Sequence, residues 1–224
     1  MCGRFAQQRP ASELAQIFDA EPLVADPGDH FNVAPTNEAM VVVEKEGRRA
    51  VTSYRWGLIP HWAEDRSIGQ RMINARAETL ATSGAFRDSF RRRRCLVPVD
   101  AFYEWRREGG LRLPHAIRRE DGQPLALAGL WSGWRDPETA EVVRTFTIVT
   151  TRSNELVASI HDRMPVVIPP DAWGRWLDPE PGDVAELNGL LVPAEPSGLV
   201  LYPVSRRVNN VRNDERELLE PLAG

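Results

Sequence analysis

Alternating apolar and polar positions divide the middle of the chain into short strands. Residues 39–44 and 50–56 are rich in β-branched and aromatic side chains and flank a glycine turn, which is typical of a β-hairpin. Glycine turns also separate several of the later runs. These runs predict further strands at residues 95–99, 102–106, 114–119, 125–131 and 142–151. We therefore expect the centre of the chain to be mainly β-sheet.

Helical patterns lie mostly outside this central region. They predict helices at residues 12–18, 75–91 (with a break near Gly84), 153–159, 171–177, 183–191 and 214–219. Strands gathered in the middle with helices around them indicate an α+β fold with a curved or barrel-like sheet. The 224 residues fit one large domain or two small ones, and no repeat or low-complexity linker divides them.

Composition excludes several classes of protein. Hydrophobic residues make up 42% of the chain and charged residues 27%, as in ordinary globular proteins, and no apolar run approaches the ~20 residues of a membrane span. The first residues lack the apolar stretch of a signal peptide, so we expect a cytoplasmic protein with no membrane partner. Two cysteines and four scattered histidines predict no disulfide framework, no metal site and no cofactor.

Charge is unevenly distributed along the chain. The net charge of −4 argues weakly against a nucleic-acid partner, but the distribution of sign matters more than the sum. Residues 91–94 are four consecutive arginines, whereas acidic residues gather at 13–29 and 178–186. Either a molecule with one basic face or a solvated, arginine-rich helix surface fits this pattern.

Cys2 is the most informative single residue. Removal of Met1 would make it the N-terminus, with an amine and a thiol on adjacent carbons, and such a pair closes a thiazolidine ring on an aldehyde. The alternative is that a small second residue only permits removal of Met1. Lys45 is the sole lysine and lies beside a predicted turn, so an imine with a carbonyl compound would use the N-terminal amine. Arginine cannot replace it, because its guanidinium keeps its proton.

Three further polar residues, Asn74, Glu104 and His161, interrupt apolar runs, where a polar group is costly unless it has a partner or a function. Asn74 could cap the predicted helix or orient a nucleophile through its amide. Glu104 could donate a proton from an apolar setting or lie on the solvent face of its strand. His161 could transfer protons near neutral pH or be purely structural.

Together these positions lie in motifs that resemble the SRAP (SOS response-associated peptidase) family. The motifs occur in the family's order and span nearly the whole chain. They are residues 1–5, 54–62, 73–79, 102–105, 160–165 and the stretch from Val204 to Asn213. The resemblance implies a single SRAP domain over residues 1–224. It also implies the SRAP fold, a curved, barrel-like and mostly antiparallel sheet core with surrounding helices.

The resemblance also implies an activity. SRAP proteins act on abasic sites in single-stranded DNA and form a covalent crosslink that shields the lesion in the DNA damage (SOS) response. The implied catalytic residues are Cys2, Asn74, Glu104 and His161. Cys2 would form the thiazolidine, with Asn74 holding its backbone or the sugar. His161 would open the sugar ring and shuttle protons, and Glu104 would protonate the departing hydroxyl. Peptidase chemistry would be the removal of Met1, by the protein itself or by an aminopeptidase.

The expected partner is single-stranded DNA containing an abasic site, bound by a monomer that is nucleoid-associated when on DNA. Basic side chains are the candidate phosphate contacts. Aromatic and proline side chains in loops could stack on bases or wedge beside them, or could simply pack. The candidates are Arg4, Pro35, Trp62, Arg76, Arg87 and Arg163. Some relatives have a basic residue at the position of Gly84, so Arg87 or residues 91–94 would have to compensate.

Two other functions fit parts of the sequence. One is a cysteine peptidase that cleaves other proteins with the thiolate of Cys2. The other is a non-covalent reader of modified DNA bases.

Overall fold

A ring of five strands forms the centre of the part of the chain that this computed structural model describes, residues 2–180 and 183–222. The strands pair in the order β11-β10-β7-β4-β5, and parallel pairing of β5 with β11 closes the ring. The other four pairings are antiparallel. The strands are β4 (Glu38–Lys45), β5 (Arg48–Trp56), β7 (Arg94–Val99), β10 (Leu125–Arg135) and β11 (Val142–Arg152).

Three short strands extend this barrel. β2 (Ala20–Pro22) pairs with β5, whereas β6 (Asn74–Arg76) and β12 (Arg163–Pro165) both pair with β11. β6 runs parallel to β11 and β12 antiparallel to it.

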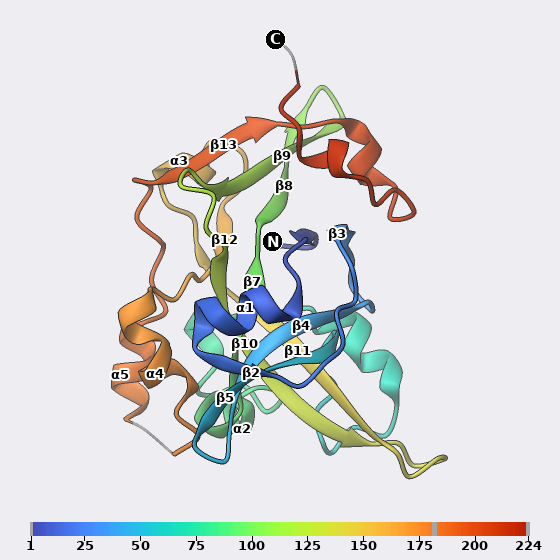
Figure 1. The fold of residues 1–224 in the computed structure, drawn as a ribbon, viewed down its shortest axis with the longest axis vertical. Helices are drawn as coiled ribbons and strands as arrows, with labels where there is room; N and C mark the ends of the chain where they lie inside the picture. The colour runs from blue at the N-terminus through green and yellow to red at the C-terminus, as the bar shows by residue number, and fades with distance from the viewer. Residues whose placement is uncertain (1, 181–182, 223–224) are drawn as a thin grey trace.

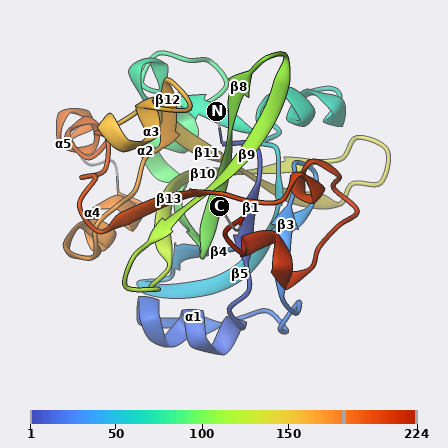
Figure 2. The same ribbon diagram turned by 90° about the horizontal axis from the view of Figure 1, so that it is seen from above.

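A second, antiparallel sheet packs over one end of the barrel (Figure 1). Its order is β13-β9-β8-β1-β3, so the first strand of the chain lies in its interior. Its strands are β1 (Phe5–Gln7), β3 (His30–Val33), β8 (Ala101–Glu108), β9 (Leu111–Arg119) and β13 (Leu199–Pro203). Figure 2 shows β8, β9 and β13 crossing above the barrel. This position of β1 carries the N-terminal residues between the two sheets.

Short helices surround the sheets. In Figure 1, α1 lies in front of the barrel, with α4 and α5 to its left. The helices are α1 (Ala11–Phe18), α2 (Arg87–Arg92), α3 (Glu155–Ala158), α4 (Trp173–Leu177) and α5 (Val184–Gly189). Short 3₁₀ helices occupy Arg66–Arg71, Ala77–Thr79, Pro170–Ala172, Arg206–Asn209 and Arg216–Leu219. No helix among the described residues is long and apolar enough to cross a membrane.

The buried side chains form three layers. On β4, Met40 and Val42 pack with the helices, whereas Val41 and Val43 belong to the cluster that also contains Cys2 and residues of the second sheet. Successive side chains of a strand face opposite ways, so a barrel covered on both faces needs an unbroken apolar run. A third cluster joins the outer face of the second sheet to the C-terminal segment.

The predicted α+β class with a curved, barrel-like and mostly antiparallel core is confirmed. The helix predicted over residues 75–91, with a break near Gly84, is confirmed only in its last part, where it overlaps α2, and is wrong before it. Residues 74–76 form β6, and a regular helix begins only at Arg87. The reason is tertiary, because β11 offers hydrogen-bonding partners to this segment: the N–H of Ile148 donates to the carbonyl of Ile73 at 3.1 Å.

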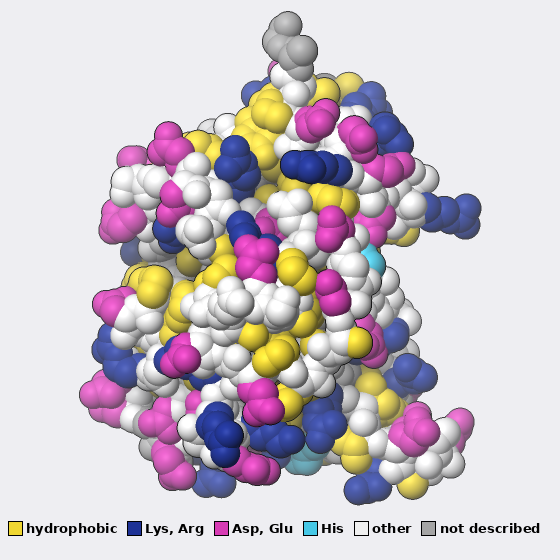
Figure 3. Space-filling model, viewed as in Figure 1, with side chains coloured by type: hydrophobic (Ala, Val, Ile, Leu, Met, Phe, Trp, Pro, Cys, Tyr) yellow, Lys and Arg dark blue, Asp and Glu magenta, His cyan; other side chains and the backbone are white. Residues whose placement is uncertain are grey.

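The four consecutive arginines do not form one basic surface. Arg91 and Arg92 are exposed, but Arg94 is buried and its guanidinium donates to the carbonyl oxygens of Phe90, Trp176 and Asp178. On the face shown in Figure 3, basic and acidic side chains are interspersed. Arg94 therefore acts as a structural residue that satisfies carbonyl groups beside two short helices.

Candidate active site

Cys2 lies in the core, three residues before the start of β1. Its side chain has no exposed surface, and its thiol approaches the carbonyl oxygen of Arg4 at 3.9 Å. β1 is fixed from both sides, since Phe5 pairs with Phe102 on β8 and with Val33 on β3. This pairing prevents the fraying usual at chain ends and holds the N-terminal segment in one place.

Asn74 holds Cys2 from the neighbouring sheet. Its Nδ2 donates a 2.8 Å hydrogen bond to the carbonyl oxygen of Cys2, and β6 places Asn74 opposite Ile148. Asn74 Oδ1 is buried and has no hydrogen-bond partner among the described residues. The expectation that Asn74 caps a helix is therefore wrong, while the alternative, an amide that orients Cys2, agrees with this contact.

A close backbone contact sets the path of the chain into β6. A Cβ atom on Gly57 would lie 2.6 Å from the carbonyl oxygen of Gly69, and Gly57 has a φ of +119°. A residue with a side chain would clash at this distance and rarely adopts this positive φ, so the position requires glycine. Trp56 adds a hydrogen bond from Nε1 to the carbonyl oxygen of Ile73 at 2.9 Å, immediately before Asn74.

Glu104 is buried on β8, opposite His115, and only 2% of its surface is exposed. The alternative prediction, that Glu104 lies on the solvent face of its strand, is therefore wrong. Burial raises the pKa of the Cys2 thiol, and the negative charge of Glu104 raises it further. The thiol of Cys2 is thus protonated at neutral pH and interacts electrostatically with this carboxylate.

His161 lies in the turn between α3 and β12. The turn is held by Asn154, which caps α3 by accepting from the N–H of Val157 at 3.0 Å. The backbone N–H of Arg163 donates to His161 Nδ1 at 2.9 Å, which leaves the proton of the neutral ring on Nε2. Asp162 Oδ1 lies 3.0 Å from the same Nδ1, so a protonated ring has a carboxylate beside it.

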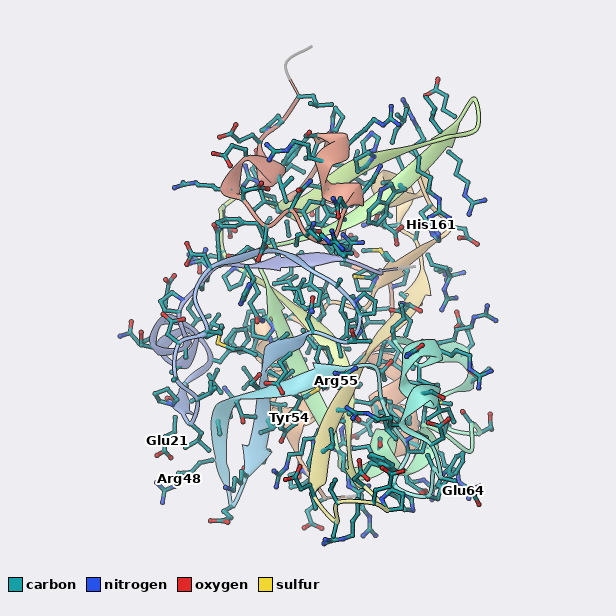
Figure 4. The ribbon with its side chains drawn as sticks, turned by 90° about the vertical axis from the view of Figure 1, so that its right-hand side faces the viewer. Glu21, Arg48, Tyr54, Arg55, Glu64 and His161 are labelled. Carbon is teal, nitrogen blue, oxygen red and sulfur yellow. The ribbon has the colours of Figure 1, made fainter. Side chains whose placement is uncertain are left out.

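Residues next to Cys2, on β8 and in the α3–β12 turn line a cavity of about 510 Å³, which we call the N-terminal cavity. Its wall includes the backbone next to Cys2 and two of the predicted catalytic side chains. In Figure 4, His161 lies on the same side of the molecule as the β8–β9 hairpin. The lining residues are Gly3, Arg4, Glu104, Trp105, Arg107, Arg112, His161 and Asn209.

Two of the predicted phosphate contacts are already bound within the protein. Arg163 makes a bidentate ion pair with Glu78, at 2.6 and 3.0 Å, and also donates to Thr150. This ion pair lowers the pKa of Glu78. Arg4 Nη1 donates to Asn32 Oδ1 and to the carbonyl oxygen of Val208, each at 2.8 Å.

The other predicted DNA contacts lie outside this cavity. Trp62 is 53% exposed in the loop after β5, and Pro35 is half-buried after β3. Arg76 and Arg87 are exposed, with Asp88 3.7 Å from Arg87. These residues remain candidates on exposure alone.

Sequence reasoning missed several residues of the cavity wall, namely Trp105, Arg107, Arg112 and Asn209. The glycine pair at 109–110 is the signal that could have found the arginines. A two-residue turn there fixes the pairing of the flanking strands. The predicted absence of a metal site stays a prediction. The structure shows no group of three or more His, Cys, Asp or Glu residues able to hold an ion within residues 2–180 and 183–222.

Comparison with known proteins agrees with the fold. The chain matches the SOS response associated peptidase (SRAP) family over residues 1–211, and it belongs to this family. It is 37% identical over 223 residues to the abasic site processing protein YoqW of Bacillus subtilis, covering 98% of this chain and 99% of that protein.

Two further relatives extend the comparison. The abasic site processing protein YedK of Escherichia coli is 33% identical over 230 residues, covering 99% of this chain and all of YedK. A crystal structure of a protein from Bacteroides thetaiotaomicron superimposes with a TM-score of 0.91 at 25% identity, covering 99% of this chain and 100% of that one. The resemblance to SRAP proteins read from the motifs is therefore confirmed.

Proposed function

We propose that this protein recognises the open-chain sugar of an abasic site in single-stranded DNA and attaches itself covalently through Cys2. One observation carries the proposal: Cys2 adjoins a cavity with Glu104 and His161 in its wall, and Asn74 holds its carbonyl. The names of YoqW and YedK as abasic site processing proteins support the choice of substrate.

The first step uses the amine of Cys2. It becomes free when Met1, which lies outside the described residues, is removed by the protein itself or by an aminopeptidase. An ordinary N-terminal amine has a pKa of about 7.7–8.0, so part of it is neutral at pH 7. The neutral amine adds to the C1′ aldehyde of the abasic sugar, and loss of one water leaves an imine.

The second step closes the ring. The sulfur of Cys2 adds to the carbon of the protonated imine and a C–S bond forms. The C=N electron pair returns to the nitrogen, which keeps the proton it already carries, and the thiol proton passes to Glu104. Burial and the charge of Glu104 keep the thiol protonated beforehand. A protonated imine brings a positive charge next to the thiol and lowers its pKa, with the Glu104 carboxylate at hand to accept the proton. The product is a thiazolidine, which does not promote the strand cleavage that an imine does.

The surrounding residues prepare both steps. When both ring nitrogens of His161 carry a proton, the ring can donate the Nε2 proton to the sugar ring oxygen as the sugar opens and its C1′ hydroxyl releases a proton to water. The imidazole ends neutral, and the carboxylate of Asp162 beside Nδ1 stabilises its charged form before the transfer. Asn74 restricts the backbone of Cys2, so amine and thiol meet the same carbon without further ordering. Removal of Met1 by these groups would account for the peptidase in the family's name.

The exposure of several side chains outside the cavity suggests where the rest of the DNA strand binds. We propose that Arg76 and Arg87 contact phosphates and that Trp62 and Pro35 contact bases, because these residues are not fully buried. Arg4 would add charge from the cavity wall, and Arg163 would act through its hold on Glu78. The whole chain would act as one domain and as a monomer.

The decisive experiment mixes the protein that begins at Cys2 with a single-stranded oligonucleotide carrying one abasic site. We expect a heat-stable adduct whose mass is that of protein plus DNA less one water. Cys2→Ala should abolish it, and the matched control Cys95→Ala, at an equally buried thiol, should retain it. Cys2→Ser keeps the amine but loses the sulfur, so borohydride should trap an imine while no heat-stable adduct accumulates.

Other outcomes identify the other functions. An adduct that survives Cys2→Ala would overturn the proposal. Turnover of unrelated peptides by the Cys2 thiol would indicate a peptidase instead. DNA binding that is unchanged in Cys2→Ala, with no covalent product from the unaltered protein, would indicate a non-covalent reader.

A further inference from the structure

Two arginines lie opposite each other in the wall of the N-terminal cavity. Strands β8 and β9 form a hairpin whose turn is Gly109-Gly110, and its register places Arg107 directly opposite Arg112. Directly opposed residues of neighbouring strands point to the same face of a sheet. Both arginines line the N-terminal cavity.

This arrangement is unfavourable for the isolated protein, because like charges directly opposite each other destabilise a strand pair. Neither Arg107 nor Arg112 forms an ion pair or a side-chain hydrogen bond with any described residue. Their neighbour Arg106, which alternates to the other face, is instead paired with Glu108 at 2.8 Å. The opposed pair thus contributes repulsion to the fold and leaves two guanidinium groups available to a ligand.

The remaining cations near the cavity are less available. Arg4 uses Nη1 for Asn32 and Val208, and Arg163 uses both terminal nitrogens for Glu78 and Thr150. An anion with several oxygens placed between Arg107 and Arg112 would remove their repulsion and could accept two hydrogen bonds from each guanidinium.

We propose that Arg107 and Arg112 clamp one backbone phosphate of the DNA strand whose sugar enters the N-terminal cavity. This inference rests on the proposed function, since it assigns a phosphodiester of the same strand to the rim of the same cavity. The clamp fixes the strand on the hairpin while Cys2 reacts inside. It is independent of base identity, as a protein that meets lesions in any sequence requires.

The test measures binding of a lesion-free single-stranded oligonucleotide over a range of salt concentrations. Each phosphate contact in a single strand contributes about 0.7 to the slope of log K against log salt. We expect Arg107→Gln and Arg112→Gln each to weaken binding. The double variant should lower the slope by about 0.7 in total, because both side chains hold the same phosphate. Arg106→Gln is the matched control, one residue away on the other face, and should leave the slope unchanged.

A neutral methylphosphonate moved along the oligonucleotide locates the contact. At one linkage it should weaken binding by the unaltered protein and have no effect on the double variant. Thermal unfolding without DNA should show no loss of stability in the double variant, because a repulsion has been removed. Slopes equal to that of the unaltered protein in both variants would overturn the clamp, and a loss near 1.4 would assign the arginines to two phosphates instead.

The two proposals fail separately. If the unaltered protein forms the adduct but the salt slope is insensitive to both arginines, the clamp is wrong and the proposed function stands. If the slope falls as expected but no adduct forms on abasic DNA, the hairpin binds a strand and the covalent chemistry is wrong.

Discussion

The regions around the two cysteines are alike in burial and different in the polar groups that surround each thiol. Cys2 and Cys95 have no exposed surface, belong to the same core cluster, and have thiol pKa values raised by burial. Cys95 lies in the middle of the barrel on β7, where a Cβ atom on Gly129 would lie only 2.6 Å from its sulfur. Cys2 lies next to a cavity with charged side chains in its wall; an amide donates to its carbonyl and the charge of Glu104 acts on its thiol.

If Cys2 reacts as proposed, its burial, equal to that of Cys95, does not distinguish a reactive cysteine from a structural one. A buried thiol is normally inert, because the thiolate is the nucleophile and burial disfavours it. Cys95 meets this description fully. In the reaction that we propose, the first nucleophile of Cys2 is its amine, and its thiol is needed only after a positive charge has formed beside it. In that reaction the position of Cys2 directly after the removed Met1 matters more than the acidity of its sulfur.

The largest expected effect on crosslinking comes from one extra residue before Cys2, which should leave Cys2, like Cys95, with a buried thiol and no free amine. In a variant with alanine inserted between Met1 and Cys2, removal of Met1 leaves the amine on alanine and the thiol one residue further along. We expect no heat-stable adduct, a loss of about a thousandfold or more in rate, because the amine and thiol no longer attack one carbon together. Electrophoresis of the adduct after heating measures it.

The same insertion supplies its own control. The variant should keep its salt-dependent affinity for lesion-free DNA, since the arginines of the cavity rim are untouched. Adduct formation at the normal rate would show that the thiol acts alone, and the distinction between the two cysteines would then have another cause.

Removal of the Asn74 amide should have the next largest effect. Asn74→Ala deletes the 2.8 Å hydrogen bond to the Cys2 carbonyl and frees the N-terminal residue to move. A misplacement of about 1 Å can cost a hundredfold in rate, so we expect the single-turnover crosslinking rate to fall by about ten- to a hundredfold. Affinity for lesion-free DNA should change little.

Asn74→Asp sharpens this result, because it keeps the size of the side chain but replaces the donor with an acceptor. It should be at least as slow as Asn74→Ala. A normal rate in Asn74→Asp would show that the shape of the side chain matters and that the hydrogen bond to Cys2 does not.

Asn74 also illustrates what the sequence could predict and what it could not. The strands of the barrel were predictable, since alternating apolar residues and glycine turns are local signals. The sequence around Asn74 has a local pattern that predicts a helix. The strand it forms instead depends on pairing with β11, more than seventy residues away, which no local pattern shows. Glu104 lies in an alternating run that fits either face, and only packing against the N-terminal segment decides which. The pairing of Arg107 with Arg112 could have been predicted from the sequence, because a two-residue turn at Gly109-Gly110 fixes the register of the two strands.

The smallest expected effect is a difference in acidity between the two thiols. The pKa of Cys2 is raised by burial first and by the charge of Glu104 second, whereas burial alone raises that of Cys95. Glu104→Gln removes the charge, so the ionisation of Cys2 should move to lower pH while that of Cys95 stays in place. Both thiols should still ionise above the ordinary value of 9.0, because burial remains.

Alkylation rates followed by mass spectrometry against pH would measure this shift, with Cys2 observed in a Cys95→Ala background and Cys95 in a Cys2→Ala background. Stability gives the sign independently. A thiol whose pKa is raised by folding keeps its proton while the unfolded chain loses it. Each thiol therefore lowers the free energy of unfolding by up to about 1.4 kcal/mol per pH unit as the pH rises above about 9. Glu104→Gln should reduce that loss through Cys2 alone, and equal shifts at both cysteines would mean that Glu104 does not distinguish them.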